Sequence, residues 1–233
     1  MKRYSHYSFD LLSTFFVGGH NKEFDQALAE YFFNDFNPKN SSIEDVQTII
    51  GDVFQMCKVS DFATGKSISG LQMCAMVLHT IGFDLKAIDH KIGIEEIYRP
   101  IEYLFRKHPP IIHPDTEQLL KTLKNNRANI SILSDTGFIE GKTYSRFLKD
   151  IGLKEYITFE IYSGDVDMSK PNESLYLMMI DGARRHYKGD LPIKHEDIVH
   201  VGRNSILDGE KVIKAGIHAH ILQGDSLLEL TNW

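Results

Sequence analysis

The chain has 233 residues, of which 42% are hydrophobic and 25% are charged, and its formal net charge is −6. This composition is typical of a globular protein with a sizeable core, and it excludes disordered and collagen-like chains. The mildly acidic balance disfavours nucleic acid and anionic membrane surfaces as partners. Two cysteines, Cys57 and Cys74, are too few for a zinc quartet or a dense disulfide framework. No apolar stretch is long enough for a signal peptide or a membrane span, so we expect a cytoplasmic protein.

The chain begins with a predicted strand and continues with predicted helices. Residues 3–10 alternate and then turn apolar, which predicts a strand that ends at Asp10. A capping-box pattern at residues 42–45 predicts the start of a helix, and apolar residues at helical spacing predict another helix over residues 71–81. Between residues 20 and 108 we find no convincing strand.

After His108-Pro109-Pro110 the pattern alternates between strands and helices. The predicted strands cover residues 130–133, 157–162, 198–201 and 218–222, and the predicted helices cover residues 115–123, 142–148, 174–186 and 208–215. Such alternation indicates a Rossmann-like parallel sheet with helices on both faces. Because a lone strand is not stable, the first strand must join this sheet. We therefore expect an α/β core of residues 1–19 and 109–233, interrupted by an all-helical domain of residues 20–108.

Ligands of such sheets bind beyond the carboxyl ends of the strands, so the residues that follow each strand are candidates for the site. They include Asp10, Thr14, Ser134, Lys170 and Asp208. A carboxylate supported by a nearby cation and by hydroxyl groups can attack an electrophilic centre and form a covalent intermediate. Each of these residues also has a purely structural explanation when it is considered alone. Asp10 then caps a turn, Ser134 caps a helix and Lys170 is solvated.

Four segments that follow the predicted strands resemble, in order, the motifs of the haloacid dehalogenase superfamily. Phe9-Asp10-Leu11-Leu12-Ser13-Thr14-Phe15 resembles its FDxDxT nucleophile motif. Residues 132–138, 163–172 and 199–209 resemble its second, third and fourth motifs. The helical block over residues 20–108 stands where members of this superfamily carry a helical cap.

The resemblance implies a hydrolase of a small, phosphorylated metabolite, with Asp10 as nucleophile and Lys170 as charge stabiliser. It implies Thr14 and Ser134 as substrate-binding residues. We add Arg203 and Asn204 as candidates from the segment after the fourth strand, and Asp135 as a candidate for either substrate contact or helix capping. It also implies a Mg²⁺ site formed by Asp10, Asp208 and the backbone carbonyl of Leu12.

Two positions depart from the phosphatase pattern. The aspartate that acts as acid and base in those relatives is Leu12 here, and a leucine can do neither. A magnesium ligand of the fourth motif is Arg203, whose positive charge repels a metal ion. Mg²⁺ binding is therefore doubtful, and Arg203 is a candidate to take the place of the metal and pair with Asp10.

Three functional hypotheses remain. The first is a phosphatase-like hydrolase that takes its acid from elsewhere, such as the cap. The second is an inactive member of the superfamily that binds a small-molecule ligand or a protein. The third is a metal-independent 2-haloacid dehalogenase, although the arginine that those enzymes carry early in the cap is missing, since Arg99 and Arg106 both lie near its end.

Overall fold

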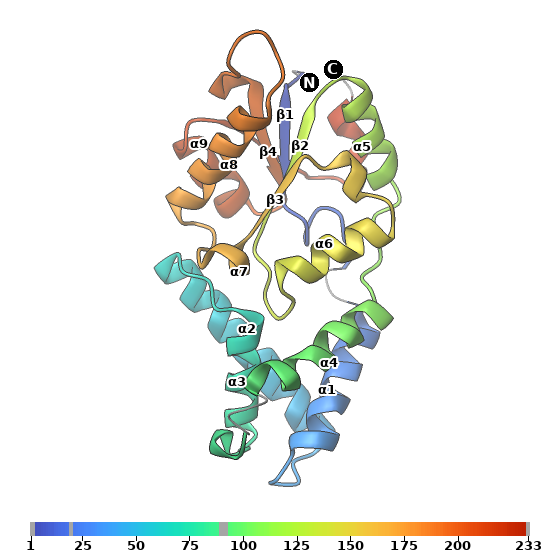
Figure 1. The fold of residues 1–233 in the computed structure, drawn as a ribbon, viewed down its shortest axis with the longest axis vertical. Helices are drawn as coiled ribbons and strands as arrows, with labels where there is room; N and C mark the ends of the chain where they lie inside the picture. Colours follow the sequence, from blue (N-terminus) through green and yellow to red (C-terminus); the bar gives the residue numbers. More distant parts are fainter. Residues whose placement is uncertain (1–2, 19–20, 89–92, 232–233) are drawn as a thin grey trace.

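The computed structural model describes residues 3–18, 21–88 and 93–231. Its centre is a five-stranded parallel sheet in the order β3-β2-β1-β4-β5 (Figure 1). The strands are β1 (His6–Phe9), β2 (Asn129–Ser134), β3 (Phe159–Tyr162), β4 (Ile198–Gly202) and β5 (His218–Ile221). Phe9 at the end of β1 is in register with Ile132 and Val201. The predicted Rossmann-like sheet is confirmed, and Asp10 follows its central strand.

Side chains of the strands alternate between two apolar layers. Ile130 and Ile132 of β2 belong to a cluster that includes Leu119 and Leu123 of α5 (Thr116–Asn125). Leu133 belongs to a second cluster, which is built from α8 (Glu173–His186) and α9 (Lys211–Lys214). Because neighbouring strand residues point to opposite faces, one short strand supplies both layers. Helices therefore cover both faces of the sheet, as predicted.

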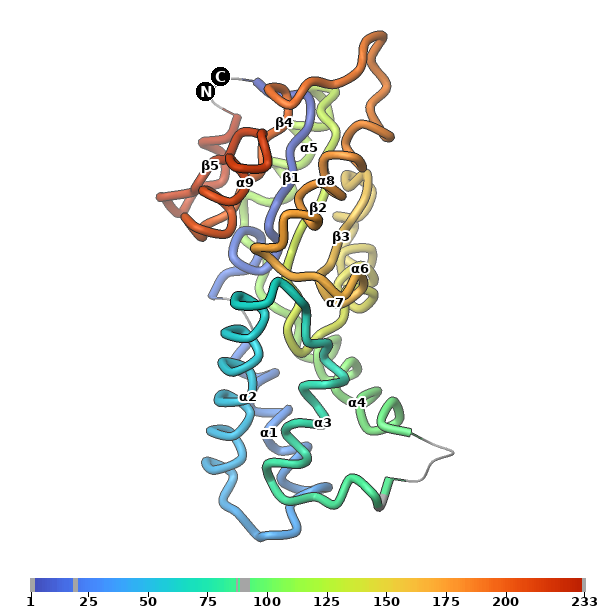
Figure 2. The backbone as a smooth tube through the Cα atoms, turned by 90° about the vertical axis from the view of Figure 1, so that its left-hand side faces the viewer, coloured from blue at the N-terminus to red at the C-terminus, as the bar shows by residue number. Residues whose placement is uncertain are grey.

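Four further helices lie together beyond the carboxyl ends of the strands (Figures 1 and 2). They are α1 (Lys22–Phe36), α2 (Ile43–Thr64), α3 (Gly70–Thr80) and α4 (Gly93–Lys107), and we call them the helical insert. Capping boxes begin α2 at Ser42 and α3 at Ser69, and Gly65 ends α2 in the left-handed conformation. The described residues between 20 and 108 contain no strand, in agreement with the sequence pattern.

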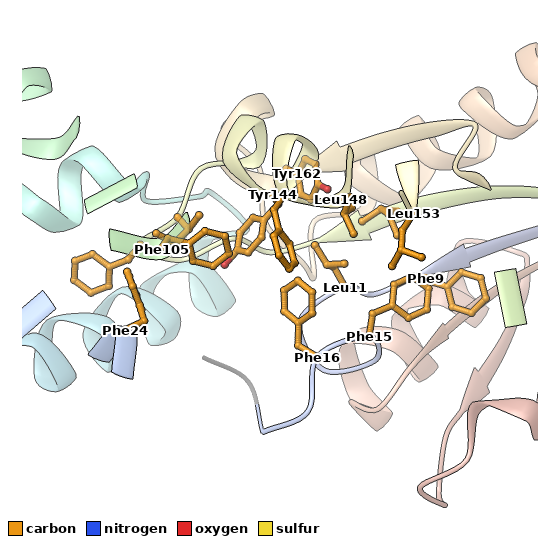
Figure 3. Packing of buried hydrophobic residues seen from close by; sticks show 14 of the residues in the cluster. Phe9, Leu11, Phe15, Phe16, Phe24, Phe105, Tyr144, Leu148, Leu153 and Tyr162 are labelled. Carbon is orange, nitrogen blue, oxygen red and sulfur yellow. The ribbon is translucent and has the colours of Figure 1, made fainter. Parts of the chain in front are cut away.

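An aromatic cluster joins the helical insert to the sheet layers (Figure 3). Phe105 of α4 lies between Phe24 of α1 and Tyr144 of α6 (Gly141–Asp150), with ring centroids 5.8 Å and 5.2 Å away. Tyr144 in turn lies 6.0 Å from Phe16, in the segment that follows β1. The insert and the sheet thus share one continuous hydrophobic cluster, which fixes the insert above the ends of the strands.

The one-turn helix α7 (Ser163–Val166) follows β3 directly. Two local predictions were wrong. The predicted strand over residues 157–162 begins only at Phe159, because a 3-10 turn occupies Lys154–Tyr156. The helix expected to begin at Asp208 begins at Ser205 as a π-helix, since the Asn204 side chain accepts the backbone N–H groups of the first turn.

Across the described residues, no helix combines the length and the apolar character needed to cross a bilayer.

Candidate active site

Asp10 is held by the tight turn that follows β1. Its backbone N–H donates to the Val201 carbonyl of β4 at 2.9 Å, which keeps it in line with the sheet. Its Oδ2 accepts the backbone N–H of Ser13 at 2.9 Å and the Ser13 hydroxyl at 2.6 Å. Asp10 therefore does cap a turn, but with only one of its two oxygens.

The other oxygen of Asp10 lies among the remaining candidate residues. Lys170 Nζ donates to Asp10 Oδ1 at 2.8 Å and to Asp208 Oδ1 at 2.7 Å. The Ser134 hydroxyl, at the end of β2, lies 3.2 Å from Asp10 Oδ1. The same hydroxyl lies 3.2 Å from the Asp135 carbonyl, so its single proton can serve either oxygen. The fold thus brings together four predicted residues from four distant segments.

The electrostatics of this cluster fix most of its protonation states. Burial opposes the charge of Lys170, but Asp10, Asp208 and Asp135 outweigh it and hold the pKa of Lys170 well above its ordinary value. Burial likewise opposes ionisation of Asp208, and Lys170 together with His200 outweighs it, so the pKa of Asp208 is strongly lowered. At neutral pH Lys170 is therefore an ammonium and Asp208 is a carboxylate.

Asp135 differs from its neighbours. Burial raises the pKa of its carboxyl to about 6, with further upward contributions from Asp10 and Asp208, although Lys170 lowers it. Its Oδ1 accepts the backbone N–H of Lys170 at 3.0 Å. Asp135 therefore positions Lys170, and its carboxyl titrates close to neutral pH.

Sequence reasoning missed two residues that support the cluster. His200 of β4 is fully buried, with Nε2 3.2 Å from Asp208 Oδ1 and Nδ1 3.0 Å from the Ser8 hydroxyl. The Tyr176 hydroxyl of α8 donates to the Leu207 carbonyl at 2.7 Å, beside Asp208. The available signal was the two-residue period of the strands, which directs Ser8 and His200 to the same face.

The other predicted residues have different surroundings. Thr14 is buried, and its hydroxyl has no hydrogen-bond partner within the described part of the chain. Asn204 caps the π-helix, and its backbone N–H donates to Asp208 Oδ2 at 3.0 Å. Arg203 does not pair with Asp10, because its Nε donates to the Ser13 carbonyl at 2.9 Å and its Nη1 to the Gly224 carbonyl at 3.0 Å.

The residues of this cluster do not fit a magnesium ion. Mg²⁺ requires an octahedral set of oxygen ligands. The two carboxylates that would supply them already share the Lys170 ammonium, and the position of a third carboxylate is taken by a guanidinium. No group of three or more metal-ligating side chains occurs in residues 3–18, 21–88 and 93–231.

A cavity of about 1030 Å³ lies between the Asp10 turn and the helical insert. Leu12, Ser13, Thr14 and Arg203 line it from the sheet side, and residues of α1 and α2 line it from the insert. Leu12 therefore borders the cavity two residues after Asp10. A ligand in this cavity lies next to the Asp10 turn.

Comparison with solved structures finds the same fold. A 2-haloacid dehalogenase from Pseudomonas syringae pv. Tomato DC3000 is 16% identical, with a TM-score of 0.61, covering 97% of this chain and 92% of that chain. A HAD phosphatase from Thermococcus onnurineus is also 16% identical, with a TM-score of 0.58, covering 91% of this chain and 83% of that chain. The putative HAD-hydrolase YfnB from Bacillus subtilis, bound to magnesium, is 17% identical, with a TM-score of 0.57, covering 93% of this chain and 87% of that chain.

A search of curated proteins finds no match. The sequence model of one family, the haloacid dehalogenase-like hydrolases, matches residues 22–220. This match includes the segments that carry Ser134, Lys170 and Asp208, and the structure brings these three residues together with Asp10, which follows β1 and precedes the matched segment. The chain belongs to the haloacid dehalogenase-like hydrolases.

Proposed function

We propose that this chain is a hydrolase in which Asp10 is the nucleophile and no divalent metal ion takes part. The observation that carries the proposal is the Lys170 ammonium, which lies 2.8 Å from Asp10 Oδ1 and 2.7 Å from Asp208 Oδ1. A buried cation at this distance pairs with the Asp10 carboxyl group and stabilises negative charge that develops beside it. Arg203, on the carbonyl of Ser13, adds a second positive charge near the turn.

The reaction has two steps. An oxygen of the Asp10 carboxylate forms a bond to an electrophilic carbon of the substrate, and the bond from that carbon to the leaving group breaks. Ser134 assists by turning its proton to the Asp135 carbonyl, which frees a lone pair on Asp10 Oδ1. Water then adds to the carbonyl carbon of the resulting ester, and the product alcohol leaves with an oxygen from Asp10. One proton of the water goes to the departing alkoxide oxygen, the other passes to solvent, and the Asp10 carboxylate is restored.

Leu12 determines which leaving groups suit this site. General acid catalysis typically contributes about 10²–10⁴-fold in rate, and a leucine cannot provide it. A leaving group that departs as a stable anion needs no proton, and a halide is the simplest example. Displacement of a halide from carbon is therefore the reaction class that the site supports best. We further propose that the helical insert acts as a cap that excludes water during the first step.

Hydrolysis of a phosphate monoester is the second candidate. The buried Thr14 hydroxyl has no partner among the described residues and, together with Ser134 and Lys170, could bind phosphoryl oxygens. Without an acid at Leu12, esters of acidic phenols should react much faster than esters of alkyl alcohols. A strong dependence of the rate on the leaving group is the signature of this candidate.

Halide release tests the proposal. Purified protein is incubated in EDTA with α-bromopropionate and with α-bromohydrocinnamate, and free bromide is measured, with Asp10→Asn as control. We expect bromide release that EDTA does not inhibit and that Asp10→Asn abolishes. p-Nitrophenyl phosphate is assayed in parallel, with and without magnesium. Turnover of the phosphate alone favours the second candidate. Activity on none of these compounds overturns the proposal and favours a member of the family that only binds a ligand.

A further inference from the structure

The cavity beside the turn that follows Asp10 has mostly apolar walls from both sides. Phe16 and Phe138 line it from the sheet side, and Leu28, Ile50 and Phe54 line it from the helical insert. The Phe54 and Phe138 rings are stacked, with centroids 6.4 Å apart and planes inclined by 18°. The volume of about 1030 Å³ is slightly above the range of ~300–1000 Å³ found for pockets that enclose drug-sized ligands. The walls therefore suit a ligand with a sizeable apolar or aromatic body.

Two cations line the same cavity, and neither is paired with a carboxylate. Arg203 is half-buried, and both groups that it binds are neutral carbonyls, those of Ser13 and Gly224. Three of its five N–H groups remain available. Lys58 of α2 is exposed, with Nζ 5.4 Å from the centre of the Phe54 ring. Within the described part of the chain, neither residue forms an ion pair.

Two acidic residues, Asp25 and Asp225, also line the cavity, but both side chains are exposed to water. Arg203, in contrast, is half-buried. A half-buried guanidinium that binds only neutral carbonyls is stabilised further by an anion, and its planar fork matches the two oxygens of a carboxylate. The polar group of the ligand is thus expected at Arg203, next to the Asp10 turn.

We propose that this cavity binds an organic monocarboxylic acid with an aryl-bearing chain. The carboxylate lies on Arg203, and the aromatic body lies among Phe16, Phe54 and Phe138. Lys58 adds a weaker attraction at the side of the helical insert. The inference rests on the proposed function only in treating this acid as the substrate, because binding to the cavity requires no reaction.

Calorimetric titration of the wild-type chain with hydrocinnamate tests the inference. This acid has no leaving group, so it cannot be turned over. We expect it to bind at least tenfold more tightly than propionate, which lacks the aromatic body, and than hydrocinnamyl alcohol, which lacks the charge. Equal affinity for acid and alcohol, or for the large and the small acid, overturns the inference. So does tighter binding of phenyl phosphate, which would make the site one for phosphate.

Substitutions test which side chains contact the bound acid. Arg203→Met should weaken hydrocinnamate binding at least tenfold, and Lys58→Met should weaken it severalfold. Arg146→Met, on an exposed position of α6, is the matched control and should bind as the wild type does. Because Arg203 also binds two backbone carbonyls, Arg203→Lys serves as a second variant, which keeps the charge and should recover part of the affinity. Unchanged binding by Arg203→Met overturns the inference.

The two proposals fail in different ways. Hydrocinnamate binding without bromide release from α-bromohydrocinnamate contradicts the proposed reaction and leaves the ligand class intact. Bromide release from α-bromopropionate without any binding of hydrocinnamate contradicts the ligand class and leaves the reaction intact.

Discussion

Replacement of Lys170 by methionine should strongly destabilise the fold. The side chain is only 3% exposed and donates to two carboxylates whose side chains are 10% and 2% exposed, those of Asp10 and Asp208. Methionine keeps much of the length but leaves two buried negative charges close together without a cation. Breaking a buried ion pair in this way typically costs about 3–5 kcal/mol. We therefore expect the free energy of unfolding of Lys170→Met to fall by about 4 kcal/mol at neutral pH.

Urea denaturation followed by circular dichroism measures this loss. Lys194→Met is the control, because Lys194 is 74% exposed and pairs with Glu196 at 3.6 Å, an arrangement worth about 0–1 kcal/mol. The double variant Lys170→Met/Asp208→Asn removes one of the two charges and should recover part of the stability. The ion cluster as described would be refuted if the free energy of unfolding of Lys170→Met fell by less than about 1 kcal/mol. It would also be refuted if the double variant were no more stable than Lys170→Met.

Three further predictions concern other parts of the molecule. Burial, with His186 and His200 nearby, lowers the pKa of His6 to about 3, whereas an unfolded histidine titrates near 6.5. As the pH falls from about 6.5 to about 3, the unfolded state binds a proton at His6 that the folded state does not bind. The free energy of unfolding therefore decreases over this range. His6→Gln should show a smaller loss in urea denaturation over this range, while exposed His218→Gln should behave as the wild type does; equal losses would argue against the prediction. His200→Phe should cost about 1.5–3 kcal/mol, because Asp208 loses a buried partner, and His200→Gln should recover part of it; equal stability of the two variants contradicts the role of the hydrogen bond. Phe105→Ala should cost about 3–5 kcal/mol, whereas Tyr103→Ala, at a residue 61% exposed on the same helix, should change stability little; similar effects would contradict the packing of α4.

Periodicity and local signals predicted the elements that carry the fold. Alternating strands and helices after residue 108 required a parallel sheet, and Asp10 at the end of an isolated strand had to join it. The capping boxes at Ser42 and Ser69 show how side chains within four residues of each other define a helix end. The π-helix that begins at Ser205 follows from the same kind of local bond, made by Asn204, but the sequence pattern did not indicate it.

The candidate site was predictable only as a set of residues. Parallel strands bring Asp10, Ser134 and Lys170 to one edge of the sheet, and the motifs identified all three. Which hydrogen-bond partners each side chain has depends on its torsion angles and on segments that are far away in the sequence. The Gly224 carbonyl, far along the chain, directs Arg203 away from Asp10, and the support of Asp208 by His200 requires the register of β4. Contacts of this kind are set by packing and have no local signature in the sequence.

The measurement that tests the account most directly is the fate of water oxygen during turnover. The chain is incubated in EDTA with α-bromohydrocinnamate in water labelled with heavy oxygen, over many turnovers, and the peptide that contains Asp10 is analysed by mass spectrometry. If Asp10 forms an ester that water opens at its carbonyl carbon, the label enters the Asp10 carboxylate while EDTA leaves the rate unchanged. Turnover that requires magnesium, or label found in the product alcohol while Asp10 stays unlabelled, would contradict a metal-independent Asp10 nucleophile.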